Sequence, residues 1–432
     1  MTEFGGVPFS TEDAVLDSRR TDRSGSAVEG RPEAVLLPRD AADVAKALRW
    51  ATSTGTPIVP RGAGTSLTGA STAGTGTVVL DLSGMNRIVS LSAADATAVV
   101  EPGVITADLD RAAATVGLRY APDPASHEIS TIGGNIATNA GGLRCAKYGV
   151  TRDSVLGLSV ILADGTRIET GTGTFKGVAG YDLTGLFVGS EGTLGVVVSA
   201  TVRLRPIPAG LTTIAASFAD AAAACTALAG VPGQPVIAEL LDAAALRAVD
   251  AYLGTSLAAR GSALLIVQAS TVDSPGVLSA LRPTAVSLEV SSDGDALLHA
   301  RRSALPAIEQ LGRPLIEDIA VPRSRLPEAI TAIADIAARW QIPICTLAHA
   351  ADGNLHPIIV DDPSRPAAAA SAADEIFALA LKLGGTITGE HGVGTLKREW
   401  LTRELDPANL TLQRGLKNLF DPQGILNPGK VL

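Results

Sequence analysis

The sequence predicts an α+β fold in two parts, and three observations support this class. Helical and strand patterns alternate along residues 32–205 and again beyond residue 210. Asp-Gly pairs between neighbouring strand patterns favour antiparallel hairpins over the crossovers of a doubly wound sheet. A proline- and glycine-rich stretch at 206–210 interrupts regular structure between the two runs. We therefore expect a first domain at residues 1–205, a second at 206–388 and a C-terminal segment at 389–432.

The first part begins with a helix whose two ends are both marked. Asp40 predicts the N-cap, an apolar stripe includes Val44 and Leu48, and Gly55 predicts the end before a strand at 57–59. Further elements of this part are strands at 77–82, 97–101, 155–163, 167–170 and 195–204 and a helix at 106–116.

The second part alternates helices and strands at longer intervals. Helices are expected near 218–229, 243–252, 293–311, 324–339 and 366–383, and strands near 236–240, 263–268, 284–290, 342–348 and 355–360. This pattern predicts one antiparallel sheet covered by helices. The C-terminal segment adds a helix around 408–419.

Composition excludes several classes of function. Hydrophobic residues make up 46% of the chain and aromatic residues 3%, so the core consists mainly of small aliphatic side chains. The net charge of −9 argues against a nucleic-acid partner. Cys145, Cys225 and Cys345 are too far apart to encode an iron–sulfur cluster or a disulfide framework. No stretch is apolar enough to span a membrane. We expect a cytoplasmic protein that binds small molecules, with peripheral attachment to a membrane partner as an alternative.

Two histidines flank an Asp-Gly pair in the segment 349–356. If Asp352 and Gly353 form a two-residue hairpin turn, His349 lies directly opposite His356, with about 4.5–5.5 Å between the Cβ atoms. Two imidazoles at that separation can bind one divalent cation, and Glu390 would supply a third ligand and leave one position open. The alternative is an ordinary hairpin with surface histidines, but three of the chain's five histidines lie in these two segments.

Three glycine-rich loops, at 60–69, 131–142 and 189–195, could expose main-chain amides to an anion. The first loop lacks the Gly-Lys-Ser/Thr of a Walker A loop, and it lacks the helix and distant acid of a Rossmann fingerprint. A single glycine loop is more often a plain turn. Three separated loops of this kind imply one extended ligand that carries phosphate.

These residues lead to a resemblance. The chain resembles the FAD enzymes of the vanillyl-alcohol oxidase and p-cresol methylhydroxylase fold, within them the branch of D-lactate dehydrogenases, glycolate oxidase catalytic subunits and D-2-hydroxyglutarate dehydrogenases. The resemblance covers nearly the whole chain and rests on segments in the family's order: 60–69, 123–124, 131–142, 148–149, 189–195, 349–356, 389–392 and 427–430.

The resemblance implies an FAD-binding domain at residues 1–205, a substrate or cap domain at 206–388, and a C-terminal segment that completes the FAD domain and the active site. FAD is expected to be non-covalent, because the first loop has no His or Cys. The residues implied to hold FAD are Pro60, Arg61, Gly62, Ala63, Gly64, Thr65, Ser66, Gly69, Pro122, Asp123, Thr131, Gly133, Gly134, Asn135, Asn139, Gly141, Tyr148, Glu191, Gly192, Gly195, Val196 and Asn427.

The implied reaction is oxidation of a D-2-hydroxy acid to a 2-keto acid. The metal, held by His349, His356 and Glu390, would acidify the substrate hydroxyl. Zn²⁺ suits these ligands best, and Mn²⁺ or Fe²⁺ would also accept them. His391, next to Glu390 but on the other side of an extended backbone, would act as general base. Arg301 matches the position that binds the substrate carboxylate.

Substrate and partners are less closely determined. Leu305, Ile316 and Ile358 stand where relatives that act on 2-hydroxyglutarate carry polar residues, which favours a monocarboxylate such as D-lactate or glycolate. The alternatives are a D-2-hydroxyglutarate dehydrogenase, a non-catalytic FAD-binding subunit of a glycolate oxidase complex, and an ether-exchanging synthase of the same fold. Electrons must leave to a separate acceptor, which is a quinone, an electron-transfer protein or oxygen. A homodimer is an open alternative.

Overall fold

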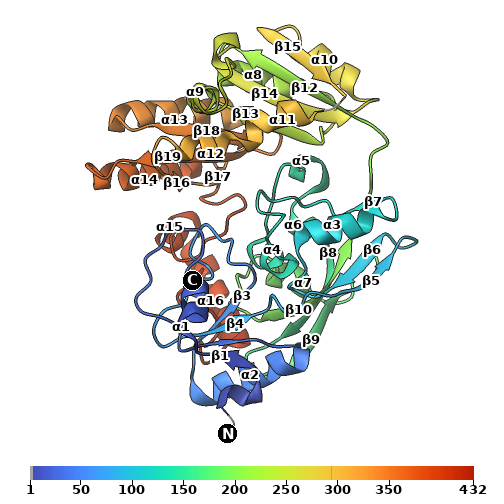
Figure 1. Ribbon diagram of the computed structural model, residues 1–432, viewed down its shortest axis with the longest axis vertical. Coiled ribbons are helices and arrows are strands. Elements are labelled where there is room, and N and C mark those ends of the chain that lie inside the picture. The colour runs from blue at the N-terminus through green and yellow to red at the C-terminus, as the bar shows by residue number, and fades with distance from the viewer. Residues whose placement is uncertain (1–2, 293) are drawn as a thin grey trace. The chain divides into compact units, whose positions relative to one another are not determined.

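The computed structural model describes residues 3–292 and 294–432 (Figure 1). The chain forms two compact units. Unit 1 comprises Met1–Gly142, Gly149–Ile207 and Glu390–Leu432, and unit 2 comprises Leu143–Tyr148 and Pro208–Gly389. In the described part of the chain, no helix is both long and apolar enough to cross a membrane.

Unit 1 contains a small sheet of strand order β1-β2-β4-β3. Its strands are β1 (Phe9–Ser10), β2 (Ala34–Leu36), β3 (Ile58–Arg61) and β4 (Val78–Asp81). Strands β2 and β3 both run parallel to β4, and α2 (Ala41–Thr54) connects β2 to β3. The predicted ends of α2 are confirmed, since the Asp40 carboxylate accepts from Asp43 N and Gly55 is left-handed with φ 67°. Val44 and Leu48 on this helix are fully buried.

The second sheet of unit 1 is antiparallel, with strand order β5-β6-β10-β8-β9. Its strands are β5 (Ile88–Ser92), β6 (Thr97–Val100), β8 (Val155–Ile161), β9 (Arg167–Gly171) and β10 (Val196–Arg203). Buried and half-buried residues alternate along β10, so one face packs into a core. The helices α3 (Thr106–Ala114) and α4 (Ile132–Thr138) contribute Leu109 and Ile136 to that core.

Shorter elements complete unit 1. They are η1 (Glu3–Gly6), α1 (Asp13–Arg19), β7 (Leu118–Arg119), α6 (Thr151–Ser154), α7 (Leu183–Phe187), β11 (Arg205–Pro206), α15 (Arg398–Glu404) and α16 (Pro407–Phe420). After α16 the chain returns to the small sheet, where Ile58 N donates to Ile425 O over 2.8 Å. The C-terminal segment is therefore part of the fold of unit 1.

Unit 2 is built on one sheet of strand order β15-β12-β14-β13-β18-β19-β16, with β17 also paired to β19. Every pairing in it is antiparallel, as predicted. The strands are β12 (Leu211–Phe218), β13 (Ile237–Leu241), β14 (Ala263–Ser270), β15 (Ser287–Ser291), β16 (Arg313–Ile316), β17 (Ile319–Ala320), β18 (Ile344–His349) and β19 (Asn354–Asp361). The sequence prediction missed β12, β16 and β17, which have no clear alternation of apolar and polar residues.

Helices cover both faces of this sheet. On one face, α9 (Ala243–Leu253), α11 (Asp295–Arg302) and α12 (Ala304–Glu309) share a core with strand residues such as Leu241 and Leu347. Alternate strand residues such as Leu240 and Leu265 are also fully buried. The sheet is further contacted by α8 (Ala221–Ala229), α10 (Ser274–Leu281), α13 (Leu326–Trp340) and α14 (Pro366–Lys382), while α5 (Cys145–Tyr148) contacts β13. The single helix predicted at 293–311 is two helices that meet at Ser303.

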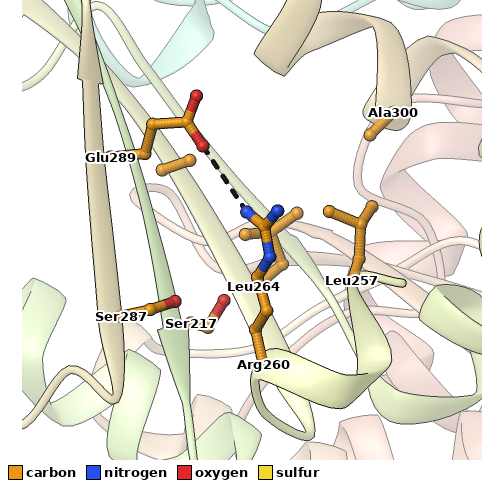
Figure 2. Close-up of a pocket in the computed structure, with 8 residues that line it drawn as sticks. Ser217, Leu257, Arg260, Leu264, Ser287, Glu289 and Ala300 are labelled. Atoms are coloured by element: carbon orange, nitrogen blue, oxygen red, sulfur yellow. Dashed lines mark ion pairs between the residues drawn. The ribbon is translucent and has the colours of Figure 1, made fainter. Parts of the chain in front are cut away.

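A shallow pocket opens over β12, β14 and β15 in unit 2 (Figure 2). The Arg260 guanidinium lies 3.5 Å from the Glu289 carboxylate inside it, so the two charges largely offset each other. The pocket is lined by Ala215, Ser217, Leu257, Arg260, Leu264, Ser287, Glu289 and Ala300. None of these is a predicted site residue.

Candidate functional site

The histidine hairpin forms, but its predicted register is wrong. His349 lies opposite Asn354, and His356 lies opposite Leu347. The connection therefore has four residues, 350–353, and the amides of Asp352 and Gly353 both donate to His349 O over 3.2 Å. Among these loop residues only Gly353 has positive φ, at 91°, whereas a two-residue turn of the expected type needs positive φ at both central positions.

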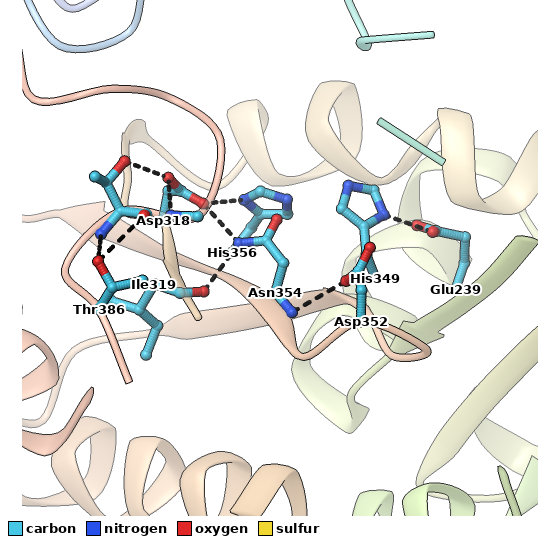
Figure 3. A network of polar contacts seen from close by, with 10 residues as sticks. Glu239, Asp318, Ile319, His349, Asp352, Asn354, His356 and Thr386 are labelled. Atoms are coloured by element: carbon cyan, nitrogen blue, oxygen red, sulfur yellow. Dashed lines mark hydrogen bonds and ion pairs between the residues drawn. The ribbon is translucent and has the colours of Figure 1, made fainter. Parts of the chain in front are cut away.

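The two histidines nevertheless lie on the same face of the sheet. The true register differs from the predicted one by two residues, and side chains along a strand return to the same face every two residues. His349 and His356 are diagonal neighbours whose ring centroids are 5.1 Å apart, with the rings nearly perpendicular (Figure 3). Each side chain is buried, with 6% of its residue surface exposed. The pairing of the imidazoles thus holds although the turn was mispredicted.

A buried carboxylate stands behind the first histidine. Glu239 on β13 lies directly opposite His349 in the β13–β18 ladder, and its Oε1 is 2.6 Å from His349 Nδ1. Its other oxygen accepts from Arg301 Nε over 2.7 Å. Burial alone would raise the pKa of Glu239, but its interactions with His349 and Arg301 outweigh it and hold this pKa below its usual range.

A second buried carboxylate stands beside the other histidine. Asp318 immediately precedes β17, whose pairing with β19 sets Ile319 opposite Leu355 and so brings Asp318 level with His356. The distance from Asp318 Oδ1 to His356 Nδ1 is 3.8 Å. Asp318 also accepts from Asn354 Nδ2 over 2.7 Å (Figure 3). Asn354 Nδ2 also donates to Ile319 O over 2.9 Å, so Asn354 connects the start of β19 to the chain at β17.

Asp318 also holds the segment that leads to the predicted third ligand. Its Oδ2 accepts from Thr388 Oγ1 and from the Gly389 amide, each over 2.8 Å. Glu390 and His391 follow as the next two residues of the chain, where it leaves unit 2.

Two overlapping groups of side chains could hold a metal ion. His349, His356 and Glu390 each offer one ligand atom, all within 4.8 Å of one another, and so do Asp318, His356 and His391. Two imidazoles and a carboxylate, largely buried and backed by further carboxylates, fit a divalent cation of the Zn²⁺ class. The residues present are therefore suited to the predicted metal.

The sequence prediction missed Glu239 and Asp318. Glu239 is the one charged residue in the otherwise apolar stretch 236–241, and a charge at a buried strand position is a signal that could have drawn attention to it. No local pattern connects it with His349, because 110 residues separate the two. The structure also ties Arg301, predicted at the substrate, to Glu239 through Nε.

In unit 1 the three glycine loops converge. A Cβ on Gly62 would lie 2.3 Å from Thr131 Oγ1, so the first loop touches the second. A Cβ on Gly192 would lie 3.1 Å from Pro60 Cγ, so the third loop touches the first. The Glu191 amide donates to Ala137 O over 2.8 Å and joins the third loop to the second. The close approaches that glycine allows thus bring three distant segments together.

Several side chains predicted to hold FAD also brace these loops. Arg61 is buried, and its Nη1 donates to Ser71 O over 3.1 Å. Asn135 Nδ2 donates to Thr106 Oγ1 over 2.7 Å. Asn139 ends α4 in the left-handed region. The side chains of these loops are therefore used largely within the protein.

Glu191 and Asn427 join the third loop to the C-terminal segment. The Glu191 carboxylate accepts from Val393 N over 2.7 Å and from Gly394 N over 2.9 Å. Burial raises the pKa of Glu191 to about 7, although the two amides oppose this rise. Asn427 Nδ2 donates to Ala70 O over 2.9 Å and to Glu191 O over 2.7 Å.

The other predicted FAD residues fall into two groups. Most are in unit 1: Ser66 Oγ accepts from the Thr68 amide, Gly69 faces Thr395, Gly133 faces Pro102, Gly134 N donates to Thr131 Oγ1, Gly141 faces the Glu390 carboxylate, Gly195 faces Val160, Asp123 O lies against Gly142, and Val196 begins β10. Tyr148 differs, since it ends α5 in unit 2 and is not brought together with the loops inside unit 1.

Two known protein families match this chain, one in its N-terminal part and one in its C-terminal part. Residues 32–171 match the family described as FAD binding domain, and residues 207–431 match FAD linked oxidases, C-terminal domain. The glycolate oxidase subunit GlcD of Bacillus subtilis is 43% identical over 421 residues, which cover 93% of this chain and 89% of that protein. The D-lactate dehydrogenase of Archaeoglobus fulgidus is 34% identical over 410 residues, covering 92% and 91%.

The fold is also found among solved structures. p-Cresol methylhydroxylase with substrate bound superimposes with a TM-score of 0.80 at 16% identity, over 98% of this chain and 93% of that one. At this identity the likeness concerns the fold alone. Because the family matches cover most of the chain, the protein belongs to the FAD-linked oxidases and is an FAD-linked oxidoreductase of the p-cresol methylhydroxylase fold.

Proposed function

We propose that the protein oxidises a D-2-hydroxy acid to the corresponding 2-keto acid, using non-covalent FAD and one divalent metal ion. The observation that carries this proposal is the pair of buried imidazoles, each with a buried carboxylate behind or beside it, in a chain of the FAD-linked oxidase family. The names of two relatives, a glycolate oxidase subunit and a D-lactate dehydrogenase, support the substrate class.

In this proposal His349, His356 and Glu390 hold the metal, with Zn²⁺ preferred over Mn²⁺ and Fe²⁺ because imidazole and carboxylate ligands suit it. When bound, the metal would supply the charge that lowers the pKa of the substrate hydroxyl, and FAD would supply the acceptor for the hydride. His391 takes the hydroxyl proton as general base. Arg301 keeps its terminal guanidinium N–H groups for the substrate carboxylate, since its Nε is bonded to Glu239.

The side chains at the expected selectivity positions favour a small aliphatic monocarboxylate, such as D-lactate or glycolate. Ile316 lies opposite Ile358 across β16 and β19, and Leu305 packs against the same apolar cluster. A second substrate carboxylate placed among these side chains would lose its hydration without gaining a partner. This counts against 2-hydroxyglutarate.

The proposal assigns FAD to residues 1–205 with 389–432, and the substrate to residues 206–388. Electrons leave FAD to a separate acceptor, a quinone, an electron-transfer protein or oxygen. The assembly state that goes with this transfer is a homodimer or a complex with another subunit.

Anaerobic reduction of the flavin tests the proposal. The metal-loaded holoenzyme is mixed with D- and L-lactate, glycolate and D-2-hydroxyglutarate, and the absorbance of oxidised flavin is followed. We expect bleaching by a D-monocarboxylate or glycolate, slower bleaching by the L-enantiomer, and loss of the reaction after treatment with a chelator. A metal-loaded preparation that no hydroxy acid reduces would contradict the catalytic role and favour a non-catalytic FAD-binding subunit.

A further inference from the structure

We propose that Glu239 is a positioning residue that holds a metal ligand and the substrate-binding arginine with one carboxylate. This inference rests on the proposed function, because it concerns how His349 and Arg301 are presented to the metal and the substrate. It adds a residue that has no place in the sequence-based account of the site.

The geometry connects three separate elements. Glu239 is on β13, His349 on β18 and Arg301 on α11. Glu239 Oε1 lies 2.6 Å from His349 Nδ1, and Glu239 Oε2 lies 2.7 Å from Arg301 Nε (Figure 3 shows the first contact). The Glu239 side chain has no exposed surface, and that of Arg301 retains 15%. Each oxygen therefore has one hydrogen-bonding partner, and the contact with His349 is shielded from water.

The contacts with Glu239 determine which atoms of His349 and Arg301 face the metal and the substrate. An ionised carboxylate only accepts hydrogen bonds, so His349 must carry its proton on Nδ1 when it donates to Glu239. Nε2 is then the nitrogen of His349 that carries the lone pair a metal ligand needs, and the contact with Glu239 holds the ring in a single orientation. Arg301 donates through Nε in the same way, which fixes the plane of its guanidinium and leaves its two terminal nitrogens for an anion.

The ladder explains why this position serves both purposes. Glu239 faces His349 because the two residues are direct partners between β13 and β18. Glu239 and His349 lie on the face of the sheet that α11 covers. Arg301 is on α11 and contacts Glu239 from that side. At this position of β13, Glu239 can thus contact the neighbouring strand β18 and the covering helix α11 at the same time.

Glu239→Gln tests the inference in the full-length holoenzyme. The amide keeps the shape of the side chain but has a single acceptor oxygen, so one of the two contacts then meets an NH₂ group. We expect Zn²⁺ to bind about 10–100-fold more weakly, measured by competition with a chromogenic chelator. FAD content should stay the same. The KM for the hydroxy acid should rise as well, because Arg301 loses its fixed orientation.

Asp242→Asn is the matched control. Asp242 directly follows β13, is half-buried, and accepts from Ala245 N and Thr346 N, neither of which belongs to a predicted metal ligand. This variant should lower the melting temperature and leave the Zn²⁺ affinity within about threefold of wild type, well inside the range expected for the loss of a supporting contact. Glu239→Asp is the second test variant, since its shorter side chain keeps the charge but cannot reach both partners, and Zn²⁺ should again bind more weakly.

The outcomes separate the inference from the proposed function. Wild-type Zn²⁺ affinity in a folded Glu239→Gln or Glu239→Asp variant overturns the role of Glu239 and leaves the proposed function standing. A wild-type protein that binds no divalent cation overturns the metal site, and the inference falls with it. If Asp242→Asn weakened Zn²⁺ binding as much as Glu239→Gln does, the loss would reflect a general disturbance of the fold. That result would also overturn the positioning role.

Discussion

At the scale of single residues, the site is organised by pairs of a histidine and a carboxylate. His349 has Glu239 at 2.6 Å, and His356 has Asp318 at 3.8 Å. Each carboxylate is fully buried and has further donors, so neither depends on the histidine alone for its stabilisation. A buried charge is tolerated only when it is paired and hydrogen bonded, which explains why these acids come with such partners.

His349 and His391 should give different results when each is replaced by alanine. His349→Ala removes a ligand, and we expect the purified protein to lose its metal but to keep FAD. His391→Ala should retain both and slow flavin reduction by about 10²–10⁴-fold, the usual contribution of a general base. Metal content by elemental analysis and single-turnover reduction distinguish the two variants.

The second possible ligand group, Asp318, His356 and His391, makes the opposite prediction. If that group held the ion, His391→Ala would lose metal and His349→Ala would not. Metal loss in His391→Ala together with retention in His349→Ala would therefore exclude the assignment made here. Replacement by alanine of His127, which belongs to neither ligand group and should change neither quantity, is the control.

At the scale of elements, the three glycine-rich segments predicted to bind FAD are held together by contacts with one another, and the second of them includes the helix α4. Gly62 touches Thr131, Gly192 touches Pro60, and the Glu191 carboxylate accepts from the amides of residues 393 and 394. Loops of this length remain in one conformation only when their polar groups are paired. Glu191 is central, because its carboxylate joins two loops far apart in sequence.

Glu191 should make stability depend on pH. Its pKa rises from 4.5 to about 7 on folding, so the folded state favours the protonated acid. The resulting stabilisation is complete below pH 4.5 and is lost as the pH rises through 7, with a total of about 3 kcal/mol at roughly 1.4 kcal/mol per pKa unit.

Glu191→Gln removes this titration. Thermal unfolding curves are recorded for wild type and Glu191→Gln between pH 4.5 and 8. As the pH rises through this range, the melting temperature of wild type should fall relative to that of Glu191→Gln. A difference that does not change with pH would contradict the raised pKa. Replacement of the exposed Glu169 by glutamine provides the comparison for a surface carboxylate.

At the scale of the whole molecule, two units with separate cores carry different parts of the proposed chemistry. Unit 1 contains the glycine loops, and unit 2 contains the sheet with the two histidines. The C-terminal segment belongs to unit 1, where residues 425–427 bind to β3, to Ala70 just after the first loop, and to Glu191 in the third loop. A ligand of unit 1 should thus stabilise segments from both ends of the chain.

Removal of FAD should therefore lower the stability of unit 1 more than that of unit 2. A ligand at 100 times its dissociation constant contributes about 2.7 kcal/mol to the free energy of unfolding of the part that binds it. Hydrogen exchange of the holoenzyme and the apoprotein, followed by peptide analysis, should show faster exchange in 58–71 and 421–427 without FAD and little change in 263–270. Equal acceleration in both units would contradict this assignment.

Sequence by itself determined the features that depend on near neighbours. The α+β class, the helix from Asp40 to Gly55 and the antiparallel sheet of unit 2 follow from local spacing and from residue types with one strong preference. The glycine-rich segment 131–142, predicted as a loop, instead contains the helix α4. The histidine pair also follows, since an error of two residues in register leaves side chains on the same face.

Tertiary structure alone decided the features that depend on pairing between distant strands. Strand β13 could have paired with any of several strands, and only the assembled sheet sets Glu239 opposite His349 and brings Asp318 level with His356. It likewise turned Arg301 toward Glu239 and Arg61 into the first loop. Such contacts join residues far apart in the chain, and the free energy that selects among them comes from burial and hydrogen bonding across the whole fold, which no local pattern records.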